Sequence, residues 1–197
     1  MRTVFSCRRF FDALTVAVVL PLLSVVGVMP VSTHAQEPPS VDSRDIPAQT
    51  LFSQAVSLER ESPKDALVKY DEVMSRFGRA TTPGSRQFAA RALLNKGSIL
   101  GKNGDDKEAI STLDRIDRNF GNEKSAAIRE VLASALVSKA EIFYKQGDVN
   151  KTIDIYDQLN KQFSNDESDF IKRLIDISEW RVAEIRARNN TALSSRP

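Results

Sequence analysis

The chain has 197 residues, with 28 basic and 26 acidic side chains, one Cys and one His. Cys7 and His34 both lie in the first 35 residues, so the remaining 162 contain neither type. That remainder excludes disulfides, cysteine nucleophiles, histidine bases and Cys/His metal sites. Because three arginines and one aspartate also lie in the first 35 residues, the remainder carries 25 basic and 25 acidic side chains. This balance argues against nucleic-acid binding.

The first 35 residues have the order of a secretory signal peptide. An arginine-containing start is followed by an uncharged run over residues 13–29 and then by small residues up to Ala35. We expect cleavage after Ala35 and export, into the periplasm of a bacterium. The alternative is a retained inner-membrane anchor facing the periplasm, because a spanning helix needs about 20 apolar residues.

The next segments differ in composition. Residues 36–49 are polar and contain three prolines, which predicts a flexible linker. Residues 50–190 have apolar side chains at helical spacing and no alternating strand pattern, so we expect one all-α domain there. Residues 191–197 are expected to form a disordered tail.

A spacing of 43 residues recurs in this domain. Phe77, Phe120 and Phe163 are separated by it, and residues 93–121 share nine identities with residues 136–164. About two identities are expected by chance over a comparison of this length. The sequence therefore contains a repeated unit.

Each unit reads as two antiparallel helices. In the second unit, Gly104 ends the first helix, Asp105 caps the second, and Gly121 is expected to close it as a C-terminal glycine. After Asp169 a further helix has no partner, which is typical of the closing helix of a stacked array. We therefore expect three stacked hairpins and one closing helix.

These residues resemble the tetratricopeptide repeat. Its small position in the first helix matches Gly97 and Ala140, and its small position in the second helix matches Ala66 and Ala109. The resemblance implies an α-solenoid. The usual unit has 34 residues, so units of 43 require longer helices or linkers. Long-unit arrays of this sort resemble envelope-assembly proteins of bacteria.

The resemblance also implies a function. First helices line a concave surface, so we expect an adaptor or assembly factor that binds a protein or peptide there. Tyr144 is the strongest candidate, because aromatic anchors dominate many interfaces, although packing on a neighbour is an equal alternative. Lys102 and Lys145 recur at the repeat spacing, and for them simple exposure to solvent is favoured over a role in binding acidic groups. The expected groove positions are Arg91, Ser98, Lys102, Glu141, Tyr144 and Lys145.

Only carboxylates remain as candidates for chemistry. Asp105 and the residues after it lack the spacing of a calcium loop, which favours helix capping. Asp71, Asp114 and Asp157 recur at the repeat spacing, which favours a role in stacking. A carboxylate-only enzyme, such as a glycosidase accessory domain, is the less favoured alternative, since it needs a non-repeating acidic pair.

The expected partners follow from these interpretations. We expect a protein or peptide partner, no nucleic acid, no metal, no cofactor and no enzymatic activity. A short array with an open end permits weak self-association. Contact with a membrane is expected only if the signal is not cleaved, in which case the chain is a membrane-tethered envelope scaffold.

Overall fold

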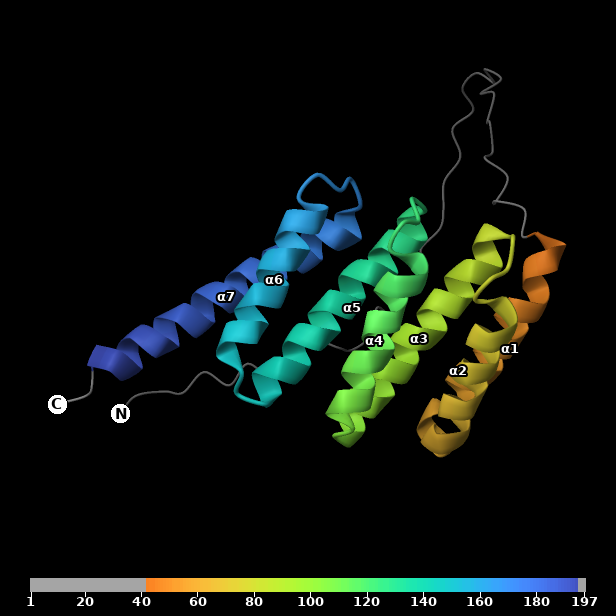
Figure 1. The fold of residues 1–197 in the computed structure, drawn as a ribbon, viewed down its shortest axis with the longest axis horizontal. Helices are drawn as coiled ribbons and strands as arrows, with labels where there is room; N and C mark the ends of the chain where they lie inside the picture. The colour runs from red at the N-terminus through yellow and green to blue at the C-terminus, as the bar shows by residue number, and fades with distance from the viewer. Residues whose placement is uncertain (1–41, 195–197) are drawn as a thin grey trace, which may run out of the picture. The chain divides into compact units, whose positions relative to one another are not determined.

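The computed structural model describes the backbone of residues 42–194 and the side chains of residues 42–188. The predicted signal peptide and its cleavage site at Ala35 lie outside this part. Within it the secondary structure is helical, without strands, and the helices follow one another in chain order (Figure 1). After a 3-10 turn at Ser43–Asp45 come α1 (Ile46–Glu61), α2 (Pro63–Phe77), α3 (Pro83–Asn103), α4 (Asp106–Phe120), α5 (Ala126–Lys145), α6 (Val149–Phe163) and α7 (Asp169–Ser194).

The helices form hairpins that stack, as the repeat predicts. The pairs α1/α2, α3/α4 and α5/α6 pack together, and each second helix also packs on the first helix of the next unit. The first helices α1, α3, α5 and α7 contact one another in sequence, so they form a continuous layer. Among the described helices, no second helix packs against another second helix. None of the described helices is long and apolar enough to cross a membrane.

The glycines of the second and third units lie at the predicted turns, and Asp105 is the N-cap residue of α4, although its side chain makes no capping hydrogen bond. Gly104 and Gly147 have φ values of 87° and 77°, the left-handed conformation that glycine adopts without strain. Gly121 is different: its φ is −57°, an ordinary right-handed helical value. Gly121 is therefore the C-cap residue of α4, as predicted, but the chain leaves α4 through a right-handed turn.

Large side chains of the second helices fill the core of each hairpin. Tyr70, Leu113 and Tyr156 recur at the repeat spacing and are each 1% exposed. At Gly97 a Cβ atom would lie 2.8 Å from Cγ and Cδ2 of Leu113, so only glycine permits this approach. The equivalent position in the next unit is Ala140, which is fully buried.

The other predicted repeat positions also lie in the core. Ala66 and Ala109 are fully buried, and Phe120 and Phe163 are 1% and 2% exposed at the ends of their helices. Phe77 is half-buried, because it lies at the edge between two clusters of core side chains.

The helical domain begins before the predicted boundary at residue 50. Helix α1 starts at Ile46, inside the stretch 36–49 that composition predicted to be a linker. Pro47 lies in the first turn, where no backbone donor is needed, so it does not break the helix. At the other end, α7 continues to Ser194, into the predicted tail.

Helix α7 takes the place of a fourth first helix. Its buried side chains lie 43 residues after α5 positions that contact the preceding unit, so α7 packs as α5 does. They are Ile171, Ser178, Val182 and Ile185.

The face of α7 that would meet a fourth second helix is polar. Where α5 buries Ala133 and Leu136 against α6, α7 carries Asp176 and Glu179, and both are exposed. A charged outer face is what the terminal unit of a stacked array needs in water. Asp176 and Glu179 therefore oppose the stacking of a second copy on this face.

Candidate functional site

Ion pairs that recur with the repeat join neighbouring units. Asp71 of α2 accepts hydrogen bonds from Lys96 of α3 at 2.8 and 3.0 Å, and Asp114 of α4 accepts one from Lys139 of α5 at 2.5 Å. The lysine side chains are only 11% and 19% exposed. Asp157 is exposed, because a valine of α7 stands where the next lysine would be. Asp71 and Asp114 therefore serve the stacking.

A second recurring contact, which we call the arginine clamp, was not predicted. In the second unit, the guanidinium of Arg86 lies 5.2 Å from the ring centroid of Phe120 and donates to Glu123 from Nε at 2.7 Å. Arg86 also donates to the backbone carbonyls of Gly78 at 3.2 Å and Asn119 at 3.4 Å. One side chain thus joins the end of α2, the start of α3 and the end of α4.

The third unit repeats the arginine clamp. Arg129 lies 5.4 Å from the ring centroid of Phe163 and donates from Nε to Asp166 at 2.6 Å. Burial alone would raise the pKa of Asp166, but hydrogen bonds from the Ser168 backbone and from Arg129 outweigh it and lower the pKa. Arg86 and Arg129 are 43 residues apart in the sequence. Their acidic partners are a glutamate in one unit and an aspartate in the other, so comparison of the units did not reveal this recurring contact.

Two of the predicted groove residues contact α7. Glu141 accepts a hydrogen bond from the Tyr156 hydroxyl at 2.7 Å and lies 3.5 Å from Arg181. Burial, followed by this hydrogen bond, raises the pKa of Tyr156. The guanidinium of Arg181 lies 5.4 Å over the Tyr144 ring, and Arg188 lies 3.4 Å from its hydroxyl. Glu141 and Tyr144 are therefore engaged by the closing helix.

The other predicted residues are spread along the first helices. Ser98 is half-buried on α3, while Lys102 and Lys145 are exposed near the C-terminal ends of α3 and α5. Arg91 is exposed on α3, with its guanidinium 5.3 Å over the ring of Phe52. The structure therefore does not bring the six predicted groove residues together in one place.

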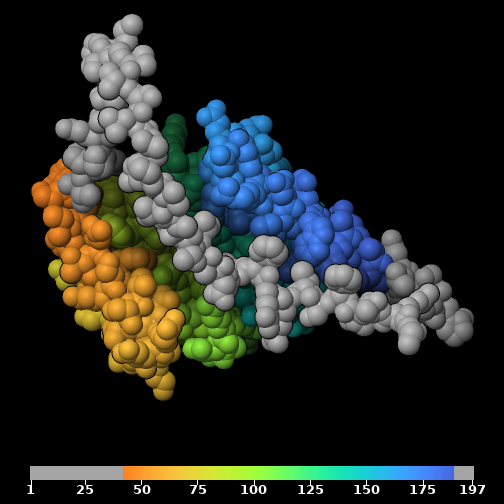
Figure 2. All heavy atoms as spheres, turned by 180° about the vertical axis from the view of Figure 1, so that it is seen from behind, coloured from red at the N-terminus to blue at the C-terminus, as the bar shows by residue number. Residues whose placement is uncertain are grey.

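A groove of about 340 Å³ opens on the layer of first helices. It lies between α3 and α5 and reaches the start of α7, and we call it the first-helix groove. In Figure 2, α1 in orange and α7 in blue lie at the two sides of the view, with the darker green of α3 between them. Residues that line the groove include Arg91, Leu94, Glu130, Val131, Ser134 and Phe170.

Helix α7 carries three exposed large apolar side chains, of which Phe170 lines this groove. Phe170, Ile177 and Trp180 are large hydrophobic residues with 38%, 52% and 61% of their surface exposed. By the repeat spacing, Ile177 corresponds to Arg91 of α3 and Ser134 of α5, both of which line the groove. Sequence reasoning placed Trp180 in the closing helix but did not predict that its side chain is exposed.

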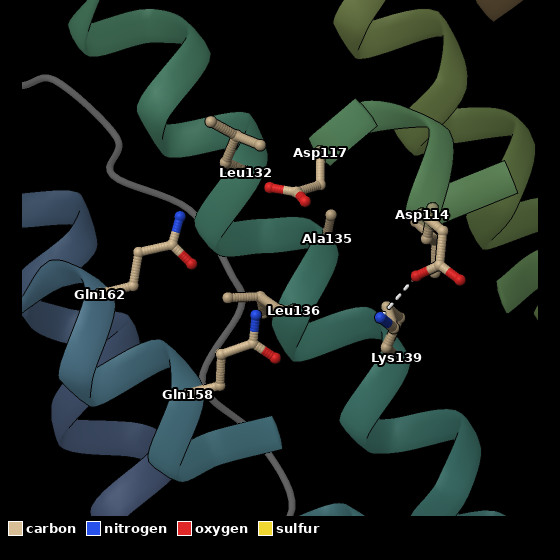
Figure 3. Close-up of a pocket in the computed structure, with 9 residues that line it drawn as sticks. Asp114, Asp117, Leu132, Ala135, Leu136, Lys139, Gln158 and Gln162 are labelled. Carbon is tan, nitrogen blue, oxygen red and sulfur yellow. Dashed lines mark hydrogen bonds and ion pairs between the residues drawn. The ribbon is translucent and has the colours of Figure 1, made fainter. Parts of the chain in front are cut away.

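A smaller cavity lies between α4, α5 and α6, and Figure 3 shows the side chains around it. Asp114 and Asp117 approach from α4, Lys139 from α5, and Gln158 and Gln162 from α6. Its volume of about 40 Å³ exceeds what one water needs but is far below the size of an ordinary ligand pocket. We therefore assign no substrate to it.

The acidic turn between α3 and α4 has a structural contact. Asp106 accepts a hydrogen bond from the Gln146 amide at 2.8 Å, which joins this turn to the turn between α5 and α6. Among the side chains that the structure describes, no group of three or more His, Cys, Asp or Glu residues is arranged to hold a metal ion.

The family comparison identifies two of the three units. The model of the tetratricopeptide repeat matches residues 91–122 and 134–166, which cover most of α3 with α4 and most of α5 with α6. Neither the curated proteins nor the solved structures contain a match to the chain. Helices packed in adjacent pairs agree with the repeats that the family model finds.

Proposed function

We propose, since the chain is a tetratricopeptide-repeat-like protein and such repeats are protein–protein interaction modules, that it is an exported adaptor or assembly factor. Its first-helix groove would bind an extended or helical segment of a partner protein. The observation that carries this proposal is the groove itself, with the exposed Phe170 in its lining and the exposed Ile177 and Trp180 on the same helix. Exposed large hydrophobic side chains beside a groove are typical of protein-binding surfaces.

The groove has the mixed chemistry that peptide recognition needs. Leu94 and Val131 supply apolar surface, while Arg91 and Glu130 supply one charge of each sign. Its volume is within the range of ordinary ligand sites, about 300–1,000 Å³. Trp180 is the strongest candidate for an energetic anchor, because tryptophan is enriched among residues that dominate interfaces.

The proposal assigns no catalysis to the chain. Asp71 and Asp114 are engaged in stacking contacts, and Asp106 accepts a hydrogen bond from Gln146. Interaction modules of this kind act by holding partners together. The alternative of a carboxylate-only enzyme is disfavoured because Asp114 and Asp117 line a cavity of only about 40 Å³, which is far smaller than an ordinary ligand site.

Export to the periplasm rests on the first 35 residues. Their charged start, apolar run and small residues before Ala35 have the order of a cleaved signal. The mass of the protein recovered from the cell envelope tests this directly. Loss of about 35 residues supports a released protein, and the intact mass supports the alternative of an anchored scaffold.

Photo-crosslinking from a single position tests the binding face. The full chain would carry a photoreactive amino acid at the exposed Ile177 of α7, the repeat position equivalent to groove residues Arg91 and Ser134, or, as a matched control, at the exposed Val68 of α2. We expect a protein from the envelope extract of the source cells to be crosslinked from position 177 and not from position 68. Trp180→Ala should abolish this product, with the circular dichroism spectrum unchanged. Equal crosslinking from both positions, or a product that survives Trp180→Ala, contradicts the proposal.

A further inference from the structure

A second groove lies on the other layer of the molecule, between the second helices α2 and α4. It has a volume of about 810 Å³. The helices α2 and α4 each pack on α3 but not on each other. We call it the arginine groove, because its lining includes Arg79, Arg115 and Arg118.

The positive charges of the three arginines are not paired within the part of the chain that the structure describes. Within residues 42–188, none of their guanidinium groups has an ion pair or a hydrogen bond, unlike Arg76, which pairs with Glu72 at 3.2 Å. The one acidic residue of the lining, Asp71, is already neutralised by Lys96 at 2.8 Å. The groove therefore has a net positive charge.

Stacking of the repeats does not require these arginines. At the equivalent positions between α4 and α6, Asn122 stands for Arg79 and Gln158 for Arg115, whereas Arg118 is matched by the basic Lys161. The space there shrinks to the cavity of about 40 Å³. A feature that stacking required would recur in every unit. The arginine groove is therefore specific to the space between α2 and α4.

The arginine clamp of the second unit holds the end of this groove in place. Arg86 donates to the carbonyl of Gly78, after α2, and to that of Asn119, near the end of α4. Gly78 and Asn119 both line the groove. Arg129 makes no equivalent bridge to backbone carbonyls. The two helix ends are therefore tied together in this interval, which lowers the conformational cost of binding.

We propose that the arginine groove binds an acidic segment of a partner protein through its carboxylates. Guanidinium groups bind carboxylates in a bidentate geometry. Arg115 and Arg118 lie three residues apart, on neighbouring positions of one helix face, and Arg79 follows the other helix. Donors spread over two helices and about 810 Å³ match several carboxylates better than one compact phosphate ion.

This second surface goes beyond the proposed function and does not depend on it. The arginine groove lies between second helices, whereas the first-helix groove is lined by α3, α5 and α7. A chain with two separate binding surfaces would connect two partners.

Fluorescence anisotropy with a labelled octa-glutamate peptide tests the inference on the full chain. We expect the peptide to bind, and an octa-glutamine peptide not to bind. The double variant Arg79→Gln/Arg115→Gln should bind octa-glutamate at least about tenfold more weakly, since it loses charge-assisted hydrogen bonds from both helices. The matched control is Arg60→Gln/Arg173→Gln, which removes the same charge from two exposed positions on α1 and α7. It should bind as the parent does.

Each other outcome overturns the inference. No binding of octa-glutamate by the parent, or an equal loss in both double variants, shows that the arginine groove is not a specific acidic-segment site. Complete displacement of the peptide by millimolar inorganic phosphate assigns the groove to phosphate instead. A self-association that disappears in Arg79→Gln/Arg115→Gln assigns it to a second copy of the chain.

Discussion

Replacing Arg129 by methionine removes the arginine clamp of the third unit and leaves the Asp166 carboxylate without its cation. The side chain of Asp166 is 8% exposed and that of Arg129 is 37% exposed. A hydrogen bond to a charged group contributes about 1.5–3 kcal/mol, and a cation over an aromatic ring adds about 0.5–1 kcal/mol. Because Arg129 is more than a third exposed, water offsets part of this. We expect Arg129→Met to lower the free energy of unfolding by about 2 kcal/mol at neutral pH.

The effect of this substitution should depend on pH. The pKa of Asp166 is lowered in the folded state, despite burial, by hydrogen bonds from the Ser168 backbone and Arg129. A carboxyl whose pKa is lowered on folding adds stability above its unfolded pKa of about 3.9, and loses it as the pH falls through the folded pKa. The difference in stability between parent and Arg129→Met should therefore shrink below about pH 4.

Urea unfolding followed by circular dichroism, at neutral pH and near pH 3, measures both effects. The double variant Arg129→Met/Asp166→Asn should recover about 1 kcal/mol, because it leaves no unpaired charge and keeps an acceptor for the Ser168 backbone. Arg173→Met, at an exposed position, is the control. A loss below about 0.5 kcal/mol for Arg129→Met, or a double variant as unstable as the single one, would refute the reasoning.

Three further predictions concern the core and the two ends of the array. Phe163→Ala should lower the free energy of unfolding in urea by about 3–5 kcal/mol, and Phe170→Ala by under about 1 kcal/mol. The reason is that the two side chains are 2% and 38% exposed. Similar losses in the two variants would contradict the assignment of the core. Asp45→Asn should lower the free energy of unfolding by about 1–2 kcal/mol at neutral pH and by less near pH 3. Burial alone would raise the pKa of Asp45, but hydrogen bonds from Ser85 and Thr82 outweigh it and lower the pKa. A cost that does not change with pH would count against this origin. Glu179→Leu/Arg186→Leu makes the outer face of α7 apolar and should increase dimer formation in sedimentation equilibrium; an unchanged molecular mass would show that this face does not control stacking.

Asp45 illustrates what composition alone misread. Residues 36–49 are rich in proline and polar side chains, which predicted a linker. In the structure the buried Asp45 carboxylate accepts hydrogen bonds from the Ser85 backbone at 2.7 Å and from its hydroxyl at 2.6 Å, at the start of α3. Its partner lies 40 residues away in the chain, so no local pattern indicates that Asp45 is held in the fold.

The groove prediction did not foresee the contacts made by α7 for a similar reason. Glu141 and Tyr144 were chosen because they occupy first-helix positions that face a concave surface in the resemblance. The closing helix then engages both of them through Arg181. Residues of α7 that the prediction left out, such as Trp180, are exposed.

The sequence by itself determined the class of fold. Helical spacing of apolar residues, glycine at turns and a 43-residue repeat are short-range properties, and each hairpin follows from them. The small residue at Gly97 opposite Leu113 could likewise be read from the repeat. The burial of Phe120 and Phe163 followed because side chains that recur in every unit serve contacts that every unit makes.

Only the tertiary structure decided which basic side chains form ion pairs and which have no acidic partner among the described residues. Lys96 and Arg86 form ion pairs in the contacts between and within units, whereas Arg79 and Arg115 have no acidic partner among the described residues. Sequence does not separate these cases, because an ion pair depends on the distance between helices of different units. The same distances leave about 810 Å³ open between α2 and α4 and only about 40 Å³ at the next interval, so the packing of whole helices determines where a partner can enter.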